Sequence, residues 1–122
     1  MARIALAACL AAVLLLATGC GVGSSDEGEV SAATQAYLED LADGDFAAAC
    51  ERLVDQAQTG DCASELERAT LRQPRGAIED RIDGRSEIEV DGDVATVGLE
   101  GGGTLELERT ASGWRIASGY PR

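Results

Sequence analysis

The chain has 122 residues, with 22 acidic residues against 10 basic ones, no histidine and a formal net charge of −12 at neutral pH. An acidic surface of this kind repels phosphate backbones, so nucleic acid is excluded as a favoured partner. Because histidine is the usual general base and a common zinc ligand, its absence also excludes Ser-His and Cys-His nucleophile pairs and most catalytic zinc sites.

The first 19 residues have the layout of a signal peptide. Arg3 gives one early positive charge, and residues 4–17 carry no charged or strongly polar side chain. This apolar run has the length of a signal-peptide core and is shorter than the roughly 20 residues that a stable transmembrane helix needs. We therefore expect residues 1–19 to be removed on export, leaving no lasting membrane span.

The leader ends in the string LATGC at residues 16–20, which resembles the lipobox that lipoprotein signal peptidase recognises before an acylated cysteine. Ala17 departs from the usual branched residue, and small residues at 17 and 19 also suit an ordinary signal peptidase. Two outcomes follow: diacylglycerol and a fatty-acyl chain such as palmitate on Cys20 anchor the protein to the outer face of the cytoplasmic membrane, or the protein is secreted. Cysteine parity favours the anchor, because lipid on Cys20 leaves Cys50 and Cys62 as a pair.

The mature chain divides into a tether and one domain. Removal of residues 1–19 takes away Arg3 and no acid, so nine basic residues face 22 acidic ones and the net charge becomes −13. Residues 20–29 are rich in glycine, serine and acids after the lipidated cysteine, which predicts a flexible tether. Residues 30–122 suffice for one small domain with a modest core.

Three amphipathic helices are predicted at the start of this domain. Apolar residues recur at helical spacing over residues 30–41, 46–57 and 62–69. Between them, residues 43–45 and 59–61 each place a glycine, which suits a helix end, before an aspartate, which suits the cap or first turn of the next helix.

From residue 87 the pattern changes to strict alternation, and four strands are predicted. The alternating segments cover residues 87–91, 94–99, 104–108 and 114–117. Short, turn-rich links favour antiparallel neighbours. We expect an α+β domain in which three N-terminal helices cover one face of a curved four-stranded antiparallel sheet.

This pattern resembles small actinobacterial lipoproteins of the NTF2-like superfamily, in which helices pack across a curved sheet to form a cone. The resemblance lies in YLEDLADGDFAAACERL at residues 37–53, in Cys62, and in VDGDVATVGL and WRIASG among the strands. Every basic residue is an arginine, and the chain has no Lys, His or Asn. This bias is typical of a GC-rich genome. The resemblance implies a ligand-binding or interaction domain of unassigned role, although the superfamily also contains isomerase-like and dehydratase-like enzymes.

The two cysteines of the domain are candidates for a structural disulfide. Cys50 lies on the apolar stripe of the second helix and Cys62 begins the third. Closing a loop of this size stabilises a fold by roughly 3 kcal/mol in the chain-entropy model. Two buried free thiols and a redox or metal role are the alternatives, but the spacing is not C-x-x-C and no histidine is available.

Aromatic residues define the candidate binding site. Tyr37, Phe46 and Trp114 are the candidates for lining the cone and contacting a ligand, although all three also suit the core. The leading hypothesis is a non-enzymatic domain that binds a small apolar ligand or another envelope protein through its cone or sheet face. A purely structural part of a larger envelope complex is a further possibility, which would show an exposed apolar patch.

The alternative is an isomerase- or lyase-like enzyme in which Tyr37 and a carboxylate move a proton inside the cone. The candidate acids are Asp40, Asp43 and Asp45, and burial raises the pKa of a carboxyl group enough for it to act as a base. The simpler interpretation leaves Asp40 in solvent and gives the other two to the helix break.

No cofactor or metal is predicted. The aspartates of residues 40–45 and 91–93 do not match a calcium-binding loop, because the later ligands and the final glutamate are misplaced. Four glutamates, at positions 87, 89, 106 and 108, are expected on the outward face of the sheet near Arg109 and Arg115. They are interpreted as a soluble surface, with an acidic patch for a basic partner as the alternative.

Overall fold

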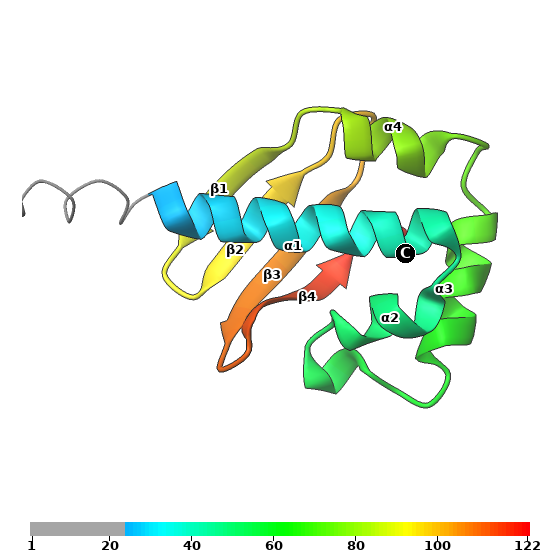
Figure 1. The fold of residues 1–122 in the computed structure, drawn as a ribbon, viewed down its shortest axis with the longest axis horizontal. Helices are drawn as coiled ribbons and strands as arrows, with labels where there is room; N and C mark the ends of the chain where they lie inside the picture. Colours follow the sequence, from blue (N-terminus) through cyan, green and yellow to red (C-terminus); the bar gives the residue numbers. More distant parts are fainter. Residues whose placement is uncertain (1–23) are drawn as a thin grey trace, which may run out of the picture.

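The computed structural model describes residues 24–122 (Figure 1). The predicted signal peptide, the LATGC string and Cys20 therefore lie outside the described residues. The helical elements are α1 (Ser24–Asp43), α2 (Phe46–Glu51), the 3-10 turn η1 (Asp55–Ala57), α3 (Cys62–Leu71) and α4 (Ala77–Asp83). The strands follow as β1 (Glu87–Asp91), β2 (Val94–Gly98), β3 (Thr104–Thr110) and β4 (Gly113–Gly119). This order confirms the predicted α+β class, with helices first and a four-stranded antiparallel sheet second.

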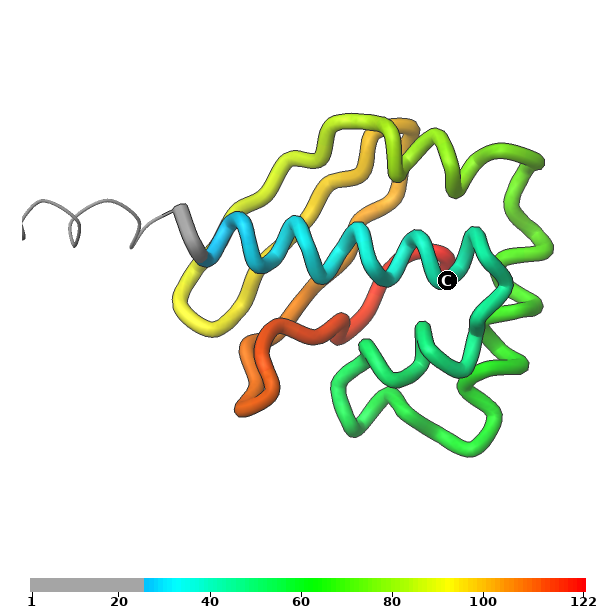
Figure 2. The backbone as a smooth tube through the Cα atoms, in the orientation of Figure 1, coloured from blue at the N-terminus to red at the C-terminus, as the bar shows by residue number. Residues whose placement is uncertain are grey.

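The sheet is a meander in which each strand pairs with the next in sequence, β1-β2-β3-β4. Val97 in β2 lies opposite Ile88 on one side and Leu105 on the other, so this row of apolar side chains points to the same face. The pairing between β3 and β4 shifts between Glu106 and Leu107. A bulge of this kind increases the local twist, and the sheet is curved, as Figure 2 shows.

The helices lie against the apolar face of the sheet. Figure 1 shows α1 crossing that face, α4 beside α1 near the link between β2 and β3, and α2 and α3 together at the end of α1 that is distant from Ser24. The last residues return to this end, where the Gln73 side-chain amide donates a hydrogen bond to the carbonyl oxygen of Pro121 at 3.4 Å. Among residues 24–122, no helix has both the length and the apolarity needed to cross a membrane.

The second helix is shorter than predicted, because the chain leaves it to pair with the sheet. α2 ends at Glu51, and Leu53 forms a parallel bridge with Ile116 of β4. The Val54 amide donates to the Ile116 carbonyl at 2.8 Å, and the Ile116 amide donates to the Arg52 carbonyl at 2.9 Å. The prediction of one helix over residues 46–57 is therefore wrong after residue 51, because the apolar residues that suggested it pack from an extended segment.

Two helical segments were not predicted. α4 follows Gly76, whose φ of 80° suits a residue without a side chain, and it buries Ile78 while Ile82 packs against the core. Residues 24–29, assigned to the tether by composition, form the first turns of α1. Asp26 and Glu27 suit the positive end of the helix dipole, and Asp26 forms an ion pair with Arg109 at 3.0 Å.

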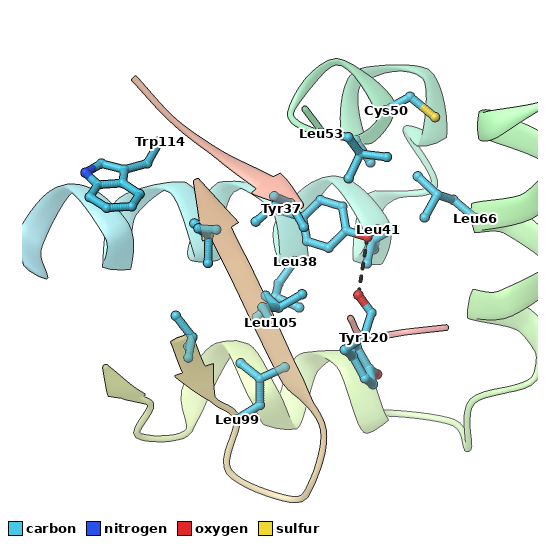
Figure 3. Packing of buried hydrophobic residues seen from close by; sticks show 14 of the residues in the cluster. Tyr37, Leu38, Leu41, Cys50, Leu53, Leu66, Leu99, Leu105, Trp114 and Tyr120 are labelled. Atoms are coloured by element: carbon cyan, nitrogen blue, oxygen red, sulfur yellow. Dashed lines mark hydrogen bonds between the residues drawn. The ribbon is translucent and has the colours of Figure 1, made fainter. Parts of the chain in front are cut away.

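The core lies between the helices and the sheet (Figure 3). Its side chains come from every predicted apolar stripe, and the largest ones that are fully buried are Tyr37, Leu38, Leu41, Leu53, Leu66, Leu105, Leu107 and Ile116. The binary pattern of the sequence therefore identified most of the core, although Leu53 packs from an extended segment and Ile78 and Tyr120 lie outside the predicted elements.

Candidate functional site

Cys50 and Cys62 form a disulfide, as predicted. Their Cα atoms are 6.1 Å apart, and the bond joins α2 to the start of α3. Both cysteines are at most 9% exposed, so the bond belongs to the core. A covalent link of this kind holds the short α2 in place, since six residues are too few for a helix that is stable by itself.

The turns on either side of this link are formed largely as predicted. Gly44 has a φ of 76° and ends α1, and the Asp45 carboxylate accepts a hydrogen bond from the Ala48 amide at 3.2 Å as the cap of α2. Asp61 occupies the cap position of α3 but makes no side-chain capping bond. The Cys62 amide instead donates to the Thr59 carbonyl at 3.1 Å, so the backbone closes this turn.

Tyr37 lies inside the domain and is 1% exposed. Its hydroxyl donates a hydrogen bond to the Tyr120 carbonyl oxygen at 3.3 Å, drawn as the dashed line in Figure 3. Burial raises the pKa of the Tyr37 hydroxyl to about 12, while the charge of Arg122 acts in the opposite direction. At neutral pH the group is therefore a protonated donor whose hydrogen goes to the backbone.

The three aspartates that were weighed as catalytic partners do not converge on Tyr37. Asp40 forms an ion pair with Arg52, Asp45 caps α2, and Asp43 is exposed. Within the described residues, none of the three shares a hydrogen bond with the Tyr37 hydroxyl. The structure therefore does not join Tyr37 to any of the three aspartates in the way that proton transfer between them requires.

Trp114 and Phe46 make different contacts from Tyr37. Trp114 is 8% exposed, and the Arg109 guanidinium stacks over its ring at 4.7 Å from the ring centre. Arg109 is held there by Asp26 at 3.0 Å and Asp93 at 3.1 Å, and these two carboxylates raise its pKa. Phe46 is partly buried against the core at the start of α2.

The interior of the predicted cone is filled by side chains. Five of the hollows on the described surface have volumes between about 110 and about 360 Å³, and neither Tyr37 nor Phe46 lines any of these five. Trp114 borders one of about 160 Å³ with Arg52 and Ser112. Small-molecule sites are usually enclosed clefts of roughly 300–1,000 Å³. The three aromatic residues therefore do not line a common ligand cavity.

Two features of the surface were missed by sequence reasoning. The Arg81 guanidinium lies over the Tyr120 ring, 4.4 Å from the ring centre, and no local sequence pattern predicts this contact. The stretch RATLRQPRG, residues 68–76, carries three arginines without an acid, and this local reversal of charge was visible in the sequence. In the part of the chain described here, no three side chains of the types that bind metal ions lie close enough together to hold one.

Comparisons of the chain with protein-family models, curated proteins and solved structures found no match. The resemblance to NTF2-like lipoproteins accordingly stays a hypothesis, while the helices-then-sheet architecture is a property of the structure itself.

Proposed function

We propose that this protein is an exported lipoprotein, anchored by lipid on Cys20 to the outer face of the cytoplasmic membrane, whose domain acts by binding another envelope protein. The domain would be a non-enzymatic member of the NTF2-like superfamily. The proposal divides into a location and a mode of action, which depend on different residues and are tested separately.

The location is supported by the leader and by the disulfide. Disulfides persist in oxidising compartments and are rare in the cytosol. With Cys50 and Cys62 joined, Cys20 has no cysteine left to pair with in the mature chain. Acylation of Cys20 removes that odd thiol, and two or more acyl chains give a lasting membrane anchor. The LATGC string immediately before the cut fits this outcome.

The mode of action is supported by the packed interior. Tyr37 is buried with its hydroxyl donating to the backbone, so its polar group is not offered to a bound molecule. The filled cone is the observation that carries the proposal, because it shifts recognition from the interior to the outer surface. Binding through an outer surface is typical of an interaction domain.

The anchor is tested by changing Cys20→Ala in the full chain. The expected result is release of the protein from the membrane fraction into the medium or periplasm, with wild-type protein retained in membranes. Mass spectrometry of the wild-type N-terminus should find the chain beginning at Cys20 with added lipid mass. Membrane retention of the variant, or an unmodified Cys20, contradicts the anchor.

The closed interior is tested with an apolar dye, anilinonaphthalene sulfonate. The Leu71→Ser variant, which lacks exposed apolar surface outside the core, provides the comparison. The native protein should bind the dye no better than this variant does. Saturable 1:1 binding that is lost on enlarging a core side chain, as in Ala95→Leu, would instead show an accessible cone. Circular dichroism of both variants provides the control for folding.

A further inference from the structure

Four arginines gather at the end of the domain formed by α3 and the last residue of the sequence. Arg68, Arg72 and Arg122 border a hollow of about 360 Å³, and Arg75 borders a neighbouring one with Leu71. We call these four arginines the basic corner. The other five arginines of residues 24–122 share the domain with 22 acidic residues. The basic corner is therefore a local reversal of the sign of the surface.

The guanidinium groups of the basic corner are available to a partner. Within residues 24–122, none of the four forms an ion pair with a carboxylate, and Arg68 donates only to the Ser64 carbonyl of its own helix, at 3.3 Å. Glu65 borders the same hollow without pairing with them. Since guanidinium groups match carboxylates in geometry, the corner is suited to an acidic protein surface.

An exposed leucine makes the basic corner selective for protein. Leu71 is 75% exposed, and it adjoins a hollow of about 270 Å³ that also contains Pro74 and Ile78. A phosphate polymer would gain nothing from this apolar side chain. A protein surface that carries carboxylates around one apolar residue would use both the arginines and Leu71.

The chain itself carries such a surface on the outward face of its sheet. Glu87, Glu89, Glu106, Glu108 and Val94 point away from the core, and we call these five residues the acidic sheet face. Val94 is 40% exposed, and its cross-strand partners are Asp91 in β1 and Glu108 in β3. The helices lie on the other face of the sheet, so no described element covers this one (Figure 1).

We propose that the basic corner of one copy docks on the acidic sheet face of a second copy, with Leu71 against Val94. These are the two large hydrophobic side chains that are exposed in the described domain. Leu71 precedes Arg72 and shares its hollow with Arg75 and Glu79, while Val94 lies between Asp91 and Glu108 in a row that continues to Arg115. Because the two surfaces are different, the contact is heterologous, and it builds a closed ring or an open chain according to the rotation between neighbouring copies. The proposal rests on the protein-interaction function above and names its partner, but it does not need the lipid.

Electrostatics give this contact a distinctive dependence on salt. Two copies of a chain with net charge −12 repel each other over a Debye length of about 30 Å at 0.01 M salt. At 0.15 M the length falls to about 8 Å, so the overall repulsion is screened while short arginine-glutamate contacts persist; at 1 M, about 3 Å, these weaken too. Association should therefore be strongest at intermediate salt.

The test is sedimentation equilibrium of the full chain in a non-ionic detergent over a range of concentrations and salts. The expected result is a mass that rises with concentration at 0.15 M salt. Arg72→Glu should weaken association about tenfold, since it replaces an attraction by a repulsion. The control is Ala47→Glu with Thr59→Glu, which makes the same change of net charge on exposed residues of α2 and of the loop after η1, and it should leave association unchanged.

A charge swap distinguishes docking from altered folding. R68E/R72E and E87R/E89R should each fail to associate alone, and a 1:1 mixture should regain association because the reversed surfaces again have opposite charges. A wild-type chain that is monomeric at every salt concentration, or a mixture that stays monomeric, overturns the proposal. The proposal is also overturned if the wild-type protein does not associate but binds polyglutamate or phosphatidylglycerol vesicles, and if Arg72→Glu abolishes that binding. Failure here leaves the anchor untouched, because membrane fractionation tests that separately.

Discussion

Removing the Cys50–Cys62 disulfide should cost the domain much of its stability. The bond links residues 12 apart in sequence, and the chain-entropy relation for a loop of this length gives about 3 kcal/mol. A small domain has a free energy of unfolding of only about 5–15 kcal/mol. The expected fall in melting temperature is roughly 12–24 °C, taking about 4–8 °C for each kcal/mol in a domain of this size.

The measurement is urea unfolding of the oxidised protein, of the same protein after reduction, and of the Cys50→Ala, Cys62→Ala double variant. Reduction keeps the buried sulfur atoms and isolates the cross-link, whereas the double variant also removes their packing, so its loss should be at least as large. Cys20→Ala is the control for removing a cysteine outside the domain and should leave the unfolding free energy unchanged. A loss below about 1 kcal/mol on reduction would refute the idea that the cross-link holds α2 in place.

Two further predictions follow from the interior. The pKa of Tyr37 is raised from 10 to about 12 in the folded state, so its contribution to stability is complete below pH 10 and is lost as the pH rises towards 12, by up to about 3 kcal/mol. Burial also raises the pKa of Tyr120, so Tyr37→Phe should reduce the alkaline slope in unfolding experiments without abolishing it, and an unchanged slope would contradict the assignment. Gly119→Ala should destabilise the domain by about 1–3 kcal/mol more than Gly113→Ala. Both glycines have positive φ, but a Cβ at Gly119 would lie 2.2 Å from the Thr104 carbonyl oxygen, whereas one at Gly113 meets nothing within 4 Å, so equal losses in thermal melts would contradict this packing.

The parts of the fold that the sequence predicted are those that depend on local periodicity. Apolar spacing identified the stripe of α1 and the strands, and residue types at 44 and 45 marked the end of α1 and the cap of α2. Two cysteines on adjoining helices were enough to predict their bond. Each of these signals lies within a few residues of the structure that it specifies.

The parts that the sequence did not predict depend on contacts between distant residues. The second helix stops at Glu51 because Leu53 bridges to Ile116, 63 residues later in the chain. The first turns of α1 lie against Arg109 through Asp26, although their composition is that of a tether. Likewise, whether Tyr37 faces a cavity or a packed core is set by Tyr120 and the leucines around it, which no local spacing reveals.

The filled interior and the uneven distribution of charge both favour recognition through the outer surface. A catalytic interpretation needs polar groups that converge in a cavity, but Asp45 caps α2, Asp40 pairs with Arg52, and the Tyr37 hydroxyl donates to the backbone. The basic corner, by contrast, keeps its arginines free of carboxylates in a domain where acids outnumber them. Within residues 24–122, Arg81 and Arg85 also form no ion pair, so it is the gathering of four like charges, rather than the missing pairs alone, that favours a carboxylate supplied by another molecule.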